Sequence, residues 1–395
     1  MGILRLCLAL AVVITHSAPI FGWAFTRLTG GQLAVQMFYV ISGFYMALVL
    51  HRRYTGPGSY RRFVTNRFLR LYPSYAVVAL LTLLVCGAVS WGSGVAIRPL
   101  DDWLASGGSL APQSLLAVIA ANALLVGQDA LMFAAVDPGT GGLYFTRDFA
   151  AEALPAYRFM LVPQAWTLGV ELSFYLIAPF VVTRRASRIG VVLALGLALR
   201  WYVRASLGLV DDPWSYRFFP IELPLFLWGA LAFKAYDALE ARGLLPRAPG
   251  YAALAFVLSA VCLHTATPHA WQTGVLGLPM LCIALGPALP FLFHATHDWE
   301  RDRAIGELSY PVYIAHGVIV HLLRRAGTDE AVIGLAACAI SVAVALALRR
   351  FVEAPVERAR HTIGSGAGER AHPRDGTAIR LGKEAPCPAP RPAPH

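Results

Sequence analysis

The sequence predicts an all-α fold, a polytopic transmembrane helical bundle, from three observations. Of the 395 residues, 57% are hydrophobic and only 14% are charged, and the mean hydropathy of +0.57 is too high for a soluble domain of this length. About ten stretches contain the roughly 20 mostly apolar residues that a spanning helix needs. The basic residues cluster between these stretches. We therefore expect one membrane-embedded domain over residues 1–361.

The predicted spans follow one another with short polar or Pro/Gly-containing breaks between them. In chain order they cover about 3–23, 33–50, 71–92, 164–183, 188–206, 219–236, 250–267, 273–293, 306–323 and 331–349. Charge decides how a further apolar stretch, near 113–133, is interpreted. If it crossed the bilayer, the cluster of Arg184, Arg185 and Arg188 would lie outside, whereas a packed or re-entrant external element leaves every basic cluster inside. We expect about ten spans, both termini cytoplasmic, and a long external segment over about 93–163.

The remaining composition excludes several classes of function. The net charge of +10 indicates membrane topology and not nucleic-acid binding, because the basic residues flank apolar stretches. The six cysteines have no spacing typical of a zinc site or a disulfide framework, and we expect no metal. Residues 362–395, rich in Gly, Pro and Arg, are expected to form a disordered cytoplasmic tail. Cleavage of a signal peptide near Ser17 is an alternative, but such a peptide has no reason to hold a histidine in its apolar part.

Two ionisable residues inside predicted spans mark the candidate site, His16 and Glu171. Arg5 and His16 are eleven positions apart, which returns to nearly the same helix face about 16 Å along the axis. His16 is expected in the outer half of its span, and Glu171 about two turns into a span entered from outside, at a similar depth. An imidazole beside a carboxylate suits proton transfer to or from a hydroxyl. The alternative is that each residue only joins helices by hydrogen bonds.

An arginine-rich segment lies between the second and third predicted spans. Most of its arginines simply obey the positive-inside rule. Arg67 and Arg70 differ because they are three positions apart on one helical face, at the mouth of the third span. Two guanidinium groups in this arrangement could hold phosphates.

The ninth predicted span contains a proline, two phenols and an imidazole, in Ser309-Tyr310-Pro311 with Tyr313 and His316. A proline there frees backbone carbonyls and commonly kinks a helix near a cavity, although a kink made only for packing is an equal alternative. Before this span, His294 and His297-Asp298 could indicate a metal site. His297 with Asp302 also has a His-x4-Asp spacing used by soluble glycerolipid acyltransferases. We discount both, because chance matches are expected among eleven histidines.

These residues resemble landmarks of a known family, the bacterial acyltransferase family 3, which comprises membrane O-acyltransferases such as O-antigen acetylases and macrolide acyltransferases. In chain order the landmarks are the pair Arg5 and His16, which looks like the family's Arg-x10-His motif; Phe38-Tyr39-Val40-Ile41-Ser42-Gly43-Phe44, similar to "FFVLSGF"; Arg67 to Pro73, with its Arg-x-x-Arg; Trp166-Thr167-Leu168-Gly169-Val170-Glu171, similar to "WSLSVE"; Ser309 to His316; and Val352-Glu353-Ala354-Pro355. The match runs from about residue 3 to 358. Two departures are Gly2 and Ile3 in place of the usual Asp-Gly before Leu-Arg, and Leu172 in place of a second acid after Glu171.

The resemblance implies transfer of an acyl group, often acetyl, from cytoplasmic acyl-CoA to a hydroxyl of a carbohydrate, glycolipid or sugar-bearing metabolite such as a polysaccharide or lipopolysaccharide. It places the protein in the bacterial cytoplasmic (inner) membrane, with acyl-CoA, expected to be acetyl-CoA, as co-substrate and no bound cofactor. His16 would act as general base or transient acyl carrier, and Glu171 would orient it. The donor phosphates would meet Arg67, Arg70 and Arg5. The supporting residues would be Trp166, Ser42, Gly43, Tyr310, Tyr313, His316 and Glu353.

Two other functions compete with this interpretation. A proton-coupled transporter or flippase of a related glycan or metabolite could use His16 and Glu171 as a relay, but we find no paired inverted repeats in the sequence. A different membrane acyltransferase fold would combine an intramembrane histidine with an asparagine, and the only asparagines, Asn66 and Asn122, lie in no such motif. The acceptor, the acyl chain length, the choice between base and covalent mechanism, and the oligomeric state stay open.

Overall fold

The computed structural model describes residues 1–264 and 277–364, and over these residues the chain is mostly helical. The ten long helices are α1 (Gly2–His16), α2 (Gly31–Arg52), α3 (Ser59–Ser93), α6 (Trp166–Val181), α7 (Ala186–Ala205), α8 (Phe219–Ala241), α9 (Arg247–Leu263), α11 (Gly277–Thr296), α13 (Ser309–Arg325) and α14 (Glu330–Leu348). Each predicted span thus overlaps a helix, while the parts of two predicted spans at 265–267 and 273–276 lie outside the described residues. The predicted tail beyond residue 364 lies outside the described residues.

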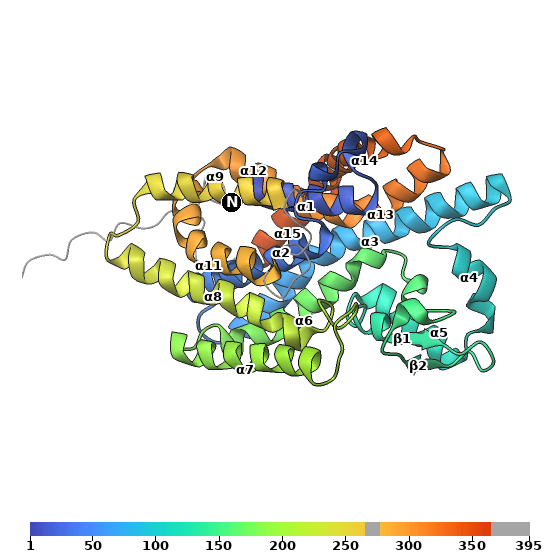
Figure 1. Cartoon of the computed structure of the whole chain (residues 1–395), viewed down its shortest axis with the longest axis horizontal. Helices are drawn as coiled ribbons and strands as arrows, with labels where there is room; N and C mark the ends of the chain where they lie inside the picture. The colour runs from blue at the N-terminus through green and yellow to red at the C-terminus, as the bar shows by residue number, and fades with distance from the viewer. Residues whose placement is uncertain (265–276, 365–395) are drawn as a thin grey trace, which may run out of the picture.

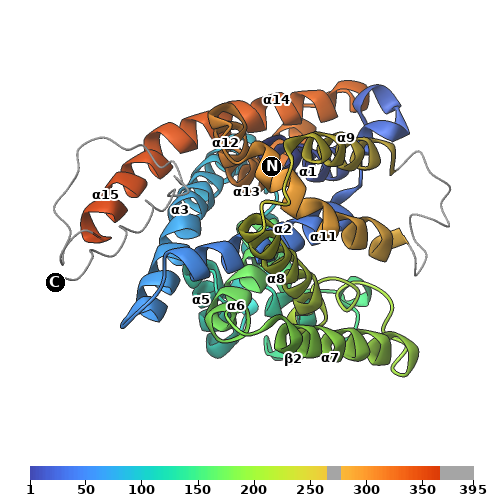
Figure 2. The same ribbon diagram turned by 90° about the vertical axis from the view of Figure 1, so that its left-hand side faces the viewer.

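Several helices are long and apolar enough to cross a bilayer, as the composition predicts. Within residues 1–264 and 277–364, four stretches meet both criteria, namely Ala24–Arg52, Ser59–Ser93, Ala186–Ala205 and Glu330–Arg360. The apolar helices α1 and α9 are shorter. The prediction of a helical membrane protein is therefore confirmed, while the count of ten spans and the cytoplasmic termini stay predictions. Figure 2 shows α14 continuing into α15 (Ala354–Gly364) along one side of the molecule, with α7 on the opposite side.

The segment between α3 and α6 forms a small separate layer. It contains α4 (Asp101–Ser106), α5 (Pro112–Leu124) and an antiparallel hairpin of β1 (Ala134–Val136) with β2 (Leu143–Phe145), which the all-α prediction omits. Figure 1 shows these elements gathered together, away from α9 and α11. The apolar stretch near 113–133 is not one helix, because α5 ends after 13 residues, about 20 Å. That length is short of a hydrocarbon core of about 30 Å.

Two helix boundaries differ from the prediction and change where the site residues lie. The first span was expected to reach residue 23, but α1 ends at His16, because the Ser17 backbone leaves the helical region (φ −95°, ψ −97°) and Pro19 follows. His16 is therefore the last residue of its helix. The third span was expected to begin at residue 71, but α3 begins at Ser59, so Arg67 and Arg70 lie inside a continuous helix.

Helix α2 lies in the middle of the bundle in both views and packs most extensively on α8 (Figures 1 and 2). Two glycines allow the close approach. A Cβ atom added at Gly43 would lie 1.8 Å from the carbonyl oxygen of Phe226, and one at Gly229 would lie 1.8 Å from that of Val40. Small residues at such crossings let helix backbones come into contact. The structure thus places the predicted supporting residue Gly43 in a helix–helix contact.

The variant Gly43→Ala is expected to lower the stability of the protein, because its new methyl group collides with the backbone of α8 and forces the helices apart. Overpacking of this kind costs about 1–3 kcal/mol. Gly190→Ala in α7 is the matched control, since a Cβ there meets nothing within 4 Å and alanine favours the helix by about 0.8–1 kcal/mol. Thermal unfolding in detergent should show a lower midpoint for Gly43→Ala alone. Equal midpoints for both variants would contradict this packing argument.

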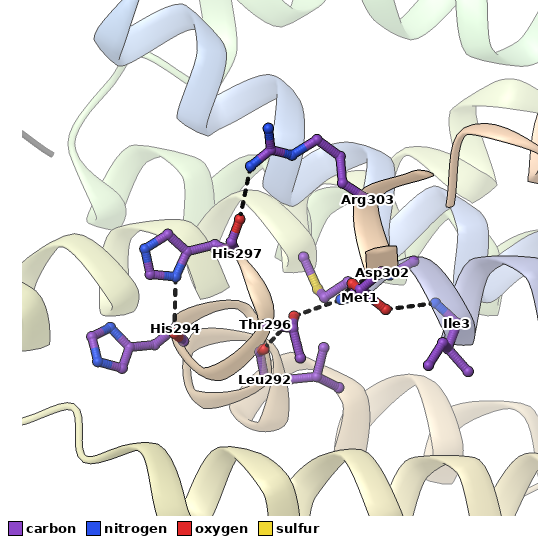
Figure 3. Close-up of polar contacts among 9 residues, drawn as sticks. Met1, Ile3, Leu292, His294, Thr296, His297, Asp302 and Arg303 are labelled. Carbon is purple, nitrogen blue, oxygen red and sulfur yellow. Dashed lines mark hydrogen bonds and ion pairs between the residues drawn. The ribbon is translucent and has the colours of Figure 1, made fainter. Parts of the chain in front are cut away.

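The start of α1 is held by a carboxylate from α12 (Glu300–Glu307), as Figure 3 shows. Asp302 accepts hydrogen bonds from the backbone N–H of Gly2 (2.6 Å) and of Ile3 (2.8 Å), and from the Met1 amino group (2.5 Å). Burial of the Asp302 carboxyl opposes ionisation, but these donors outweigh it and hold its pKa below the usual range. A carboxylate at a helix N-terminus stabilises the helix dipole. This contact sets the position of α1, and therefore of Arg5 within it.

The structure shows what contacts the residues of the two discounted patterns, the possible metal site at His294 and His297 and the His-x4-Asp spacing of His297 with Asp302. Asp302 contacts the start of α1, and the Nδ1 atom of His297 lies 2.8 Å from the carbonyl oxygen of His294 (Figure 3). Among the residues that the structure describes, no group of three or more His, Cys, Asp or Glu side chains is arranged to hold a metal ion.

Candidate functional site

The end of α1 presents His16 with one ring nitrogen available. Its Nδ1 atom lies 2.9 Å from the carbonyl oxygen of Val12, and its side chain is exposed. A carbonyl oxygen can only accept a hydrogen bond, so we assign the hydrogen of the neutral ring to Nδ1, which leaves a lone pair on Nε2. The arrangement therefore offers a base, or a nucleophile, at Nε2.

A second helix fixes the end of α1. The Nη2 atom of Arg324, in α13, donates to the carbonyl oxygens of His16 (3.2 Å) and Ser17 (2.8 Å). These carbonyls have no partner inside α1, because the last carbonyls of a helix lack an intrahelical donor. A cation at this end also favours the helix dipole. Arg324 thereby holds the residue that carries the imidazole.

His316, a predicted supporting residue, packs beside His16. The two ring centroids are 5.0 Å apart with an interplanar angle of 39°. His316 is buried, and its Nδ1 atom lies 2.6 Å from the carbonyl oxygen of Tyr313, so the same argument assigns its hydrogen to Nδ1. The structure brings together two imidazoles whose Nε2 atoms both carry lone pairs.

Tyr313 joins this pair to the beginning of α6. Its hydroxyl donates to the carbonyl oxygen of Gln164 (3.0 Å) and accepts a hydrogen bond from Thr167 (2.9 Å). The side chain of Gln164 in turn donates to the carbonyl oxygen of Ile314 (2.7 Å). These buried hydrogen bonds tie α13 to the helix that carries Glu171. Trp166, the first residue of α6, packs edge-on against Tyr216 at 5.2 Å.

Glu171 has partners other than His16. Its Oε1 atom accepts hydrogen bonds from Ser42 (2.9 Å) and from the hydroxyl of Tyr175. No hydrogen bond or ion pair joins it to His16 in the described part of the chain, so the expected orienting contact stays a prediction. The negative charge of Glu171 acts instead on Arg5, towards the start of α1, and on Tyr313. Ser42, another predicted supporting residue, therefore contacts Glu171 directly.

The three predicted donor-binding arginines lie on two helices, Arg5 on α1 and the other two on α3. Arg70 acts electrostatically on Arg5, and Arg67 lies over the ring of Phe63 at 5.7 Å. The Nε atom of Arg67 is buried and has no hydrogen-bond partner among the described residues. None of these three arginines forms an ion pair there. Gathered, unpaired guanidinium groups are typical of a site for an anion.

The remaining predicted residues surround Arg70. Ser74 donates to Glu353 (3.0 Å), which lies in the π-helical turn between α14 and α15. Tyr310 donates to the carbonyl oxygen of Leu71 (2.5 Å). The charge of Arg70 acts on both Glu353 and Tyr310. These contacts join α3, α13 and the π-helical turn around one arginine.

Arg360, in α15, is a candidate residue that the sequence interpretation missed. Its Nε atom donates to Asn66 (3.3 Å), the residue before Arg67, and the charges of Arg67 and Arg70 both act on it. The sequence contains a hint of this, since Arg358 and Arg360 form a basic cluster, but that cluster was assigned to topology alone. Only the fold of α15 back onto α3 reveals Arg360 as a fourth arginine at the anion site.

A second missed feature is a buried carboxylate with a complete set of partners. Glu222, in α8, is 0% exposed, accepts a hydrogen bond from Arg200 (2.9 Å), and accepts two from the amide of Gln36 (3.2 and 3.1 Å). An acid inside the predicted span 219–236 could have been found by the rule that singled out Glu171. Because its partners are all present, we interpret it as a structural ion pair that joins α2, α7 and α8.

The fold and the site define a helical membrane protein with an accessible imidazole at one end of an inner helix and unpaired arginines towards the other. The chain belongs to the acyltransferase family 3, whose family model, described as "Acyltransferase domain", matches residues 1–350. This confirms the resemblance found in the motifs, and the protein is a membrane acyltransferase.

Two curated relatives are similar to the chain. The "Exopolysaccharide production protein ExoZ" of Rhizobium meliloti (strain 1021) is 25% identical over 379 residues, which cover 91% of this chain and 100% of that protein. An uncharacterized protein of Aquifex aeolicus (strain VF5) is 24% identical over 216 residues, which cover 51% of this chain and 90% of that protein. No solved structure matches the chain.

Proposed function

We propose that this acyltransferase moves an acyl group, often acetyl, from cytoplasmic acyl-CoA to a hydroxyl of a carbohydrate, glycolipid or sugar-bearing metabolite, in the bacterial inner membrane. The observation that carries the proposal is that the two ends of α1 carry different chemical groups. Arg5, near the unpaired arginines, and His16, with its lone pair on Nε2, lie on one helix about 16 Å apart. Anionic phosphates suit the first end, and a nucleophilic hydroxyl suits the second.

The chemistry of this proposal needs one base and one bound thioester. The Nε2 atom of His16 removes the proton of the acceptor hydroxyl as its oxygen attacks the thioester carbonyl carbon. The tetrahedral intermediate then expels CoA as a thiolate. The thiolate takes the proton from the imidazolium, and the products are an ester and free CoA. In the covalent alternative, Nε2 itself attacks the thioester carbonyl carbon and expels the CoA thiolate, which leaves an acyl-imidazolium. The hydroxyl oxygen then attacks the acyl carbon, the neutral imidazole leaves, and the hydroxyl proton passes to the CoA thiolate. Both routes use the nitrogen that Val12 leaves free.

The acceptor class rests on the similarity to known proteins. One relative, which the chain matches over nearly its full length, is named for exopolysaccharide production, and this supports a glycan hydroxyl. The arginine end of the site would face the cytoplasm, where acyl-CoA is available, and the His16 end would face outward.

The proposal is tested with the purified protein in liposomes, supplied with acyl-CoA labelled on its acyl group and with a glycan fraction from the native cells. Transfer of label to the glycan, with release of CoA thiol in equal amount, is the expected result. Glycan that crosses the membrane without any acyl-CoA would instead support the transporter alternative. Mass spectrometry of glycans from cells with and without the gene would then identify the acyl group that is lost.

Arg360→Gln is expected to raise the KM for acyl-CoA by about tenfold, with a smaller change in kcat. Losing a hydrogen bond to a charged group costs about 1.5–3 kcal/mol, and 1.4 kcal/mol corresponds to a tenfold change. Arg358→Gln is the matched control, because Arg358 lies on the same helix and is exposed. Steady-state kinetics with varied acyl-CoA measures both. An unchanged KM in Arg360→Gln, or the same rise in both variants, would remove Arg360 from the donor site.

A further inference from the structure

A cavity of about 570 Å³ lies beside the hairpin, and no step of the proposed reaction uses it. Its walls come from β1 and β2, from the turn before β1, and from the segment that leads into α8. Small-molecule sites usually have volumes of about 300–1,000 Å³. The cavity is therefore large enough for a compact polar ligand.

Half of the residues that line the cavity are aromatic. Trp214 packs edge-on against Phe133 (5.0 Å) and Phe218 (5.3 Å), and its indole N–H donates to the carbonyl oxygen of Arg147 (2.9 Å). Phe145 of β2 also packs edge-on against Trp214 (6.2 Å). Tyr144 and Phe145 are 42% and 62% exposed, although both are large aromatic residues. Rigid aromatic faces left open in this way suit a ligand that presents flat C–H surfaces, as a sugar ring does.

Two polar groups complete the wall, one of each charge. The carboxylate of Asp129 receives only backbone N–H groups, its own and that of Ala130, and no ion pair or side-chain donor reaches it among the described residues. Arg217 is held by Asp212, at 2.5 and 2.7 Å, and its guanidinium lies over the ring of Trp166 at 4.4 Å. Asp129 therefore keeps oxygen lone pairs for hydroxyl donors. A purely hydrocarbon ligand would leave this carboxylate desolvated and unpaired.

The same polar groups connect the cavity with the catalytic region. A Cβ atom added at Gly169 would lie 2.5 Å from Oδ1 of Asp129, so the carboxylate lies against α6, two residues before Glu171. The charge of Arg217 acts on His16 and on Tyr313. A ligand in the cavity would lie next to the helix that carries Glu171 and within the electrostatic reach of the imidazole.

We propose that this cavity binds the saccharide part of the acceptor, with a sugar ring stacked on the aromatic wall of β2 and its hydroxyls donating to Asp129. The inference rests on the proposed acyl transfer for its biological role, but it makes a separate claim about binding. It assigns Asp129, Tyr144 and Phe145 to acceptor recognition.

Binding is tested first, without any acyl-CoA. The full-length protein in nanodiscs, free of sugar-based detergent, is mixed with the methyl glycosides of glucose, galactose and mannose, and saturation-transfer NMR measures contact with each. We expect at least one glycoside to bind, and Asp129→Ala and Phe145→Ala to weaken that binding about tenfold. Trp91→Ala is the matched control, because Trp91 is an aromatic residue 92% exposed at the far end of α3. No binding by any of the three glycosides, or equal binding in every variant, overturns the proposal.

Kinetics then separates the two claims. In the acyl-transfer assay, Asp129→Ala and Phe145→Ala should raise the KM for the acceptor about tenfold and leave the KM for acyl-CoA unchanged. If both variants transfer the acyl group with an unchanged KM for the acceptor, the cavity does not bind the acceptor, but the proposed acyl transfer is still supported. If the wild-type protein binds a glycoside saturably but transfers no acyl group, the binding claim is supported and the proposed function is overturned. Displacement of the glycoside by a fatty acid would assign the cavity to lipid and also overturn the inference.

Discussion

Replacing His16 with alanine is expected to lower the rate of acyl transfer by about a thousandfold. General acid–base catalysis by a positioned side chain contributes about 10²–10⁴-fold, and the free Nε2 atom of His16 is the base in the proposed reaction. The measurement is CoA release and labelled product in liposomes that contain equal amounts of folded protein. The KM for acyl-CoA should stay close to that of the wild type, because the arginines are untouched.

The surroundings of His16 make this variant informative. Its side chain is exposed and its polar partner is a carbonyl of its own helix, so its loss leaves no buried group unpaired. Thr15→Ala is the matched control, since Thr15 is the preceding residue, is also exposed, and donates in the same way to Ala11 (2.8 Å). Thr15→Ala should keep nearly full activity. An active His16→Ala enzyme would remove His16 from the mechanism.

A comparison of the wild-type protein with His16→Ala separates the base mechanism from the covalent one. Labelled acyl-CoA is added without acceptor, the reaction is stopped rapidly, and the protein is examined for bound label by mass spectrometry. An acyl group on residue 16 of the wild type that is absent from His16→Ala would establish the acyl carrier. Release of CoA only when acceptor is present, with unlabelled protein, would establish the base.

The second large effect is expected for Glu171→Gln, with activity lower by about a hundredfold. The amide can still accept hydrogen bonds from Ser42 and Tyr175, so the geometry is kept while the charge is lost. That charge acts on Arg5, which otherwise lies in the field of Arg70. A partly buried cation that loses a nearby negative charge is destabilised, and an altered Arg5 would disturb the arginine end of the site. Kinetics with Glu171→Gln and Ser42→Ala should show the smaller loss for Ser42→Ala, which keeps the charge of Glu171.

The fully buried carboxylate of Glu222 provides the contrast for Glu171, which is only partly buried. Glu222→Gln breaks a paired, fully buried carboxylate, which typically costs about 3–5 kcal/mol, so it should reduce the amount of folded protein and leave the activity per folded molecule unchanged. Glu171→Gln should instead leave the amount of folded protein unchanged and lower the activity per folded molecule. If both variants lost activity only in proportion to folded protein, Glu171 would be a structural residue like Glu222.

The sequence by itself determined the class of the protein. Hydropathy is a local property, so the apolar stretches located all ten long helices, and the motifs placed the chain in its acyltransferase family. It also singled out His16 and Glu171, because a bilayer makes ionisable residues inside a span costly and therefore conspicuous. Spacing along one helix also related Arg67 to Arg70, since residues three apart share a face, and their joint role stays a prediction.

Only the tertiary structure decided which of these residues meet. The imidazole of His16 lies beside His316, while Glu171 contacts Ser42, and neither pairing follows from spacing, because the residues lie on different helices. The return of α15 onto α3 adds Arg360 to the arginines, and the hairpin makes one wall of the cavity. Periodicity reports which face of a helix is apolar, whereas the partner of that face depends on how all the helices pack together. For this reason the sequence could name the site residues but could not arrange them.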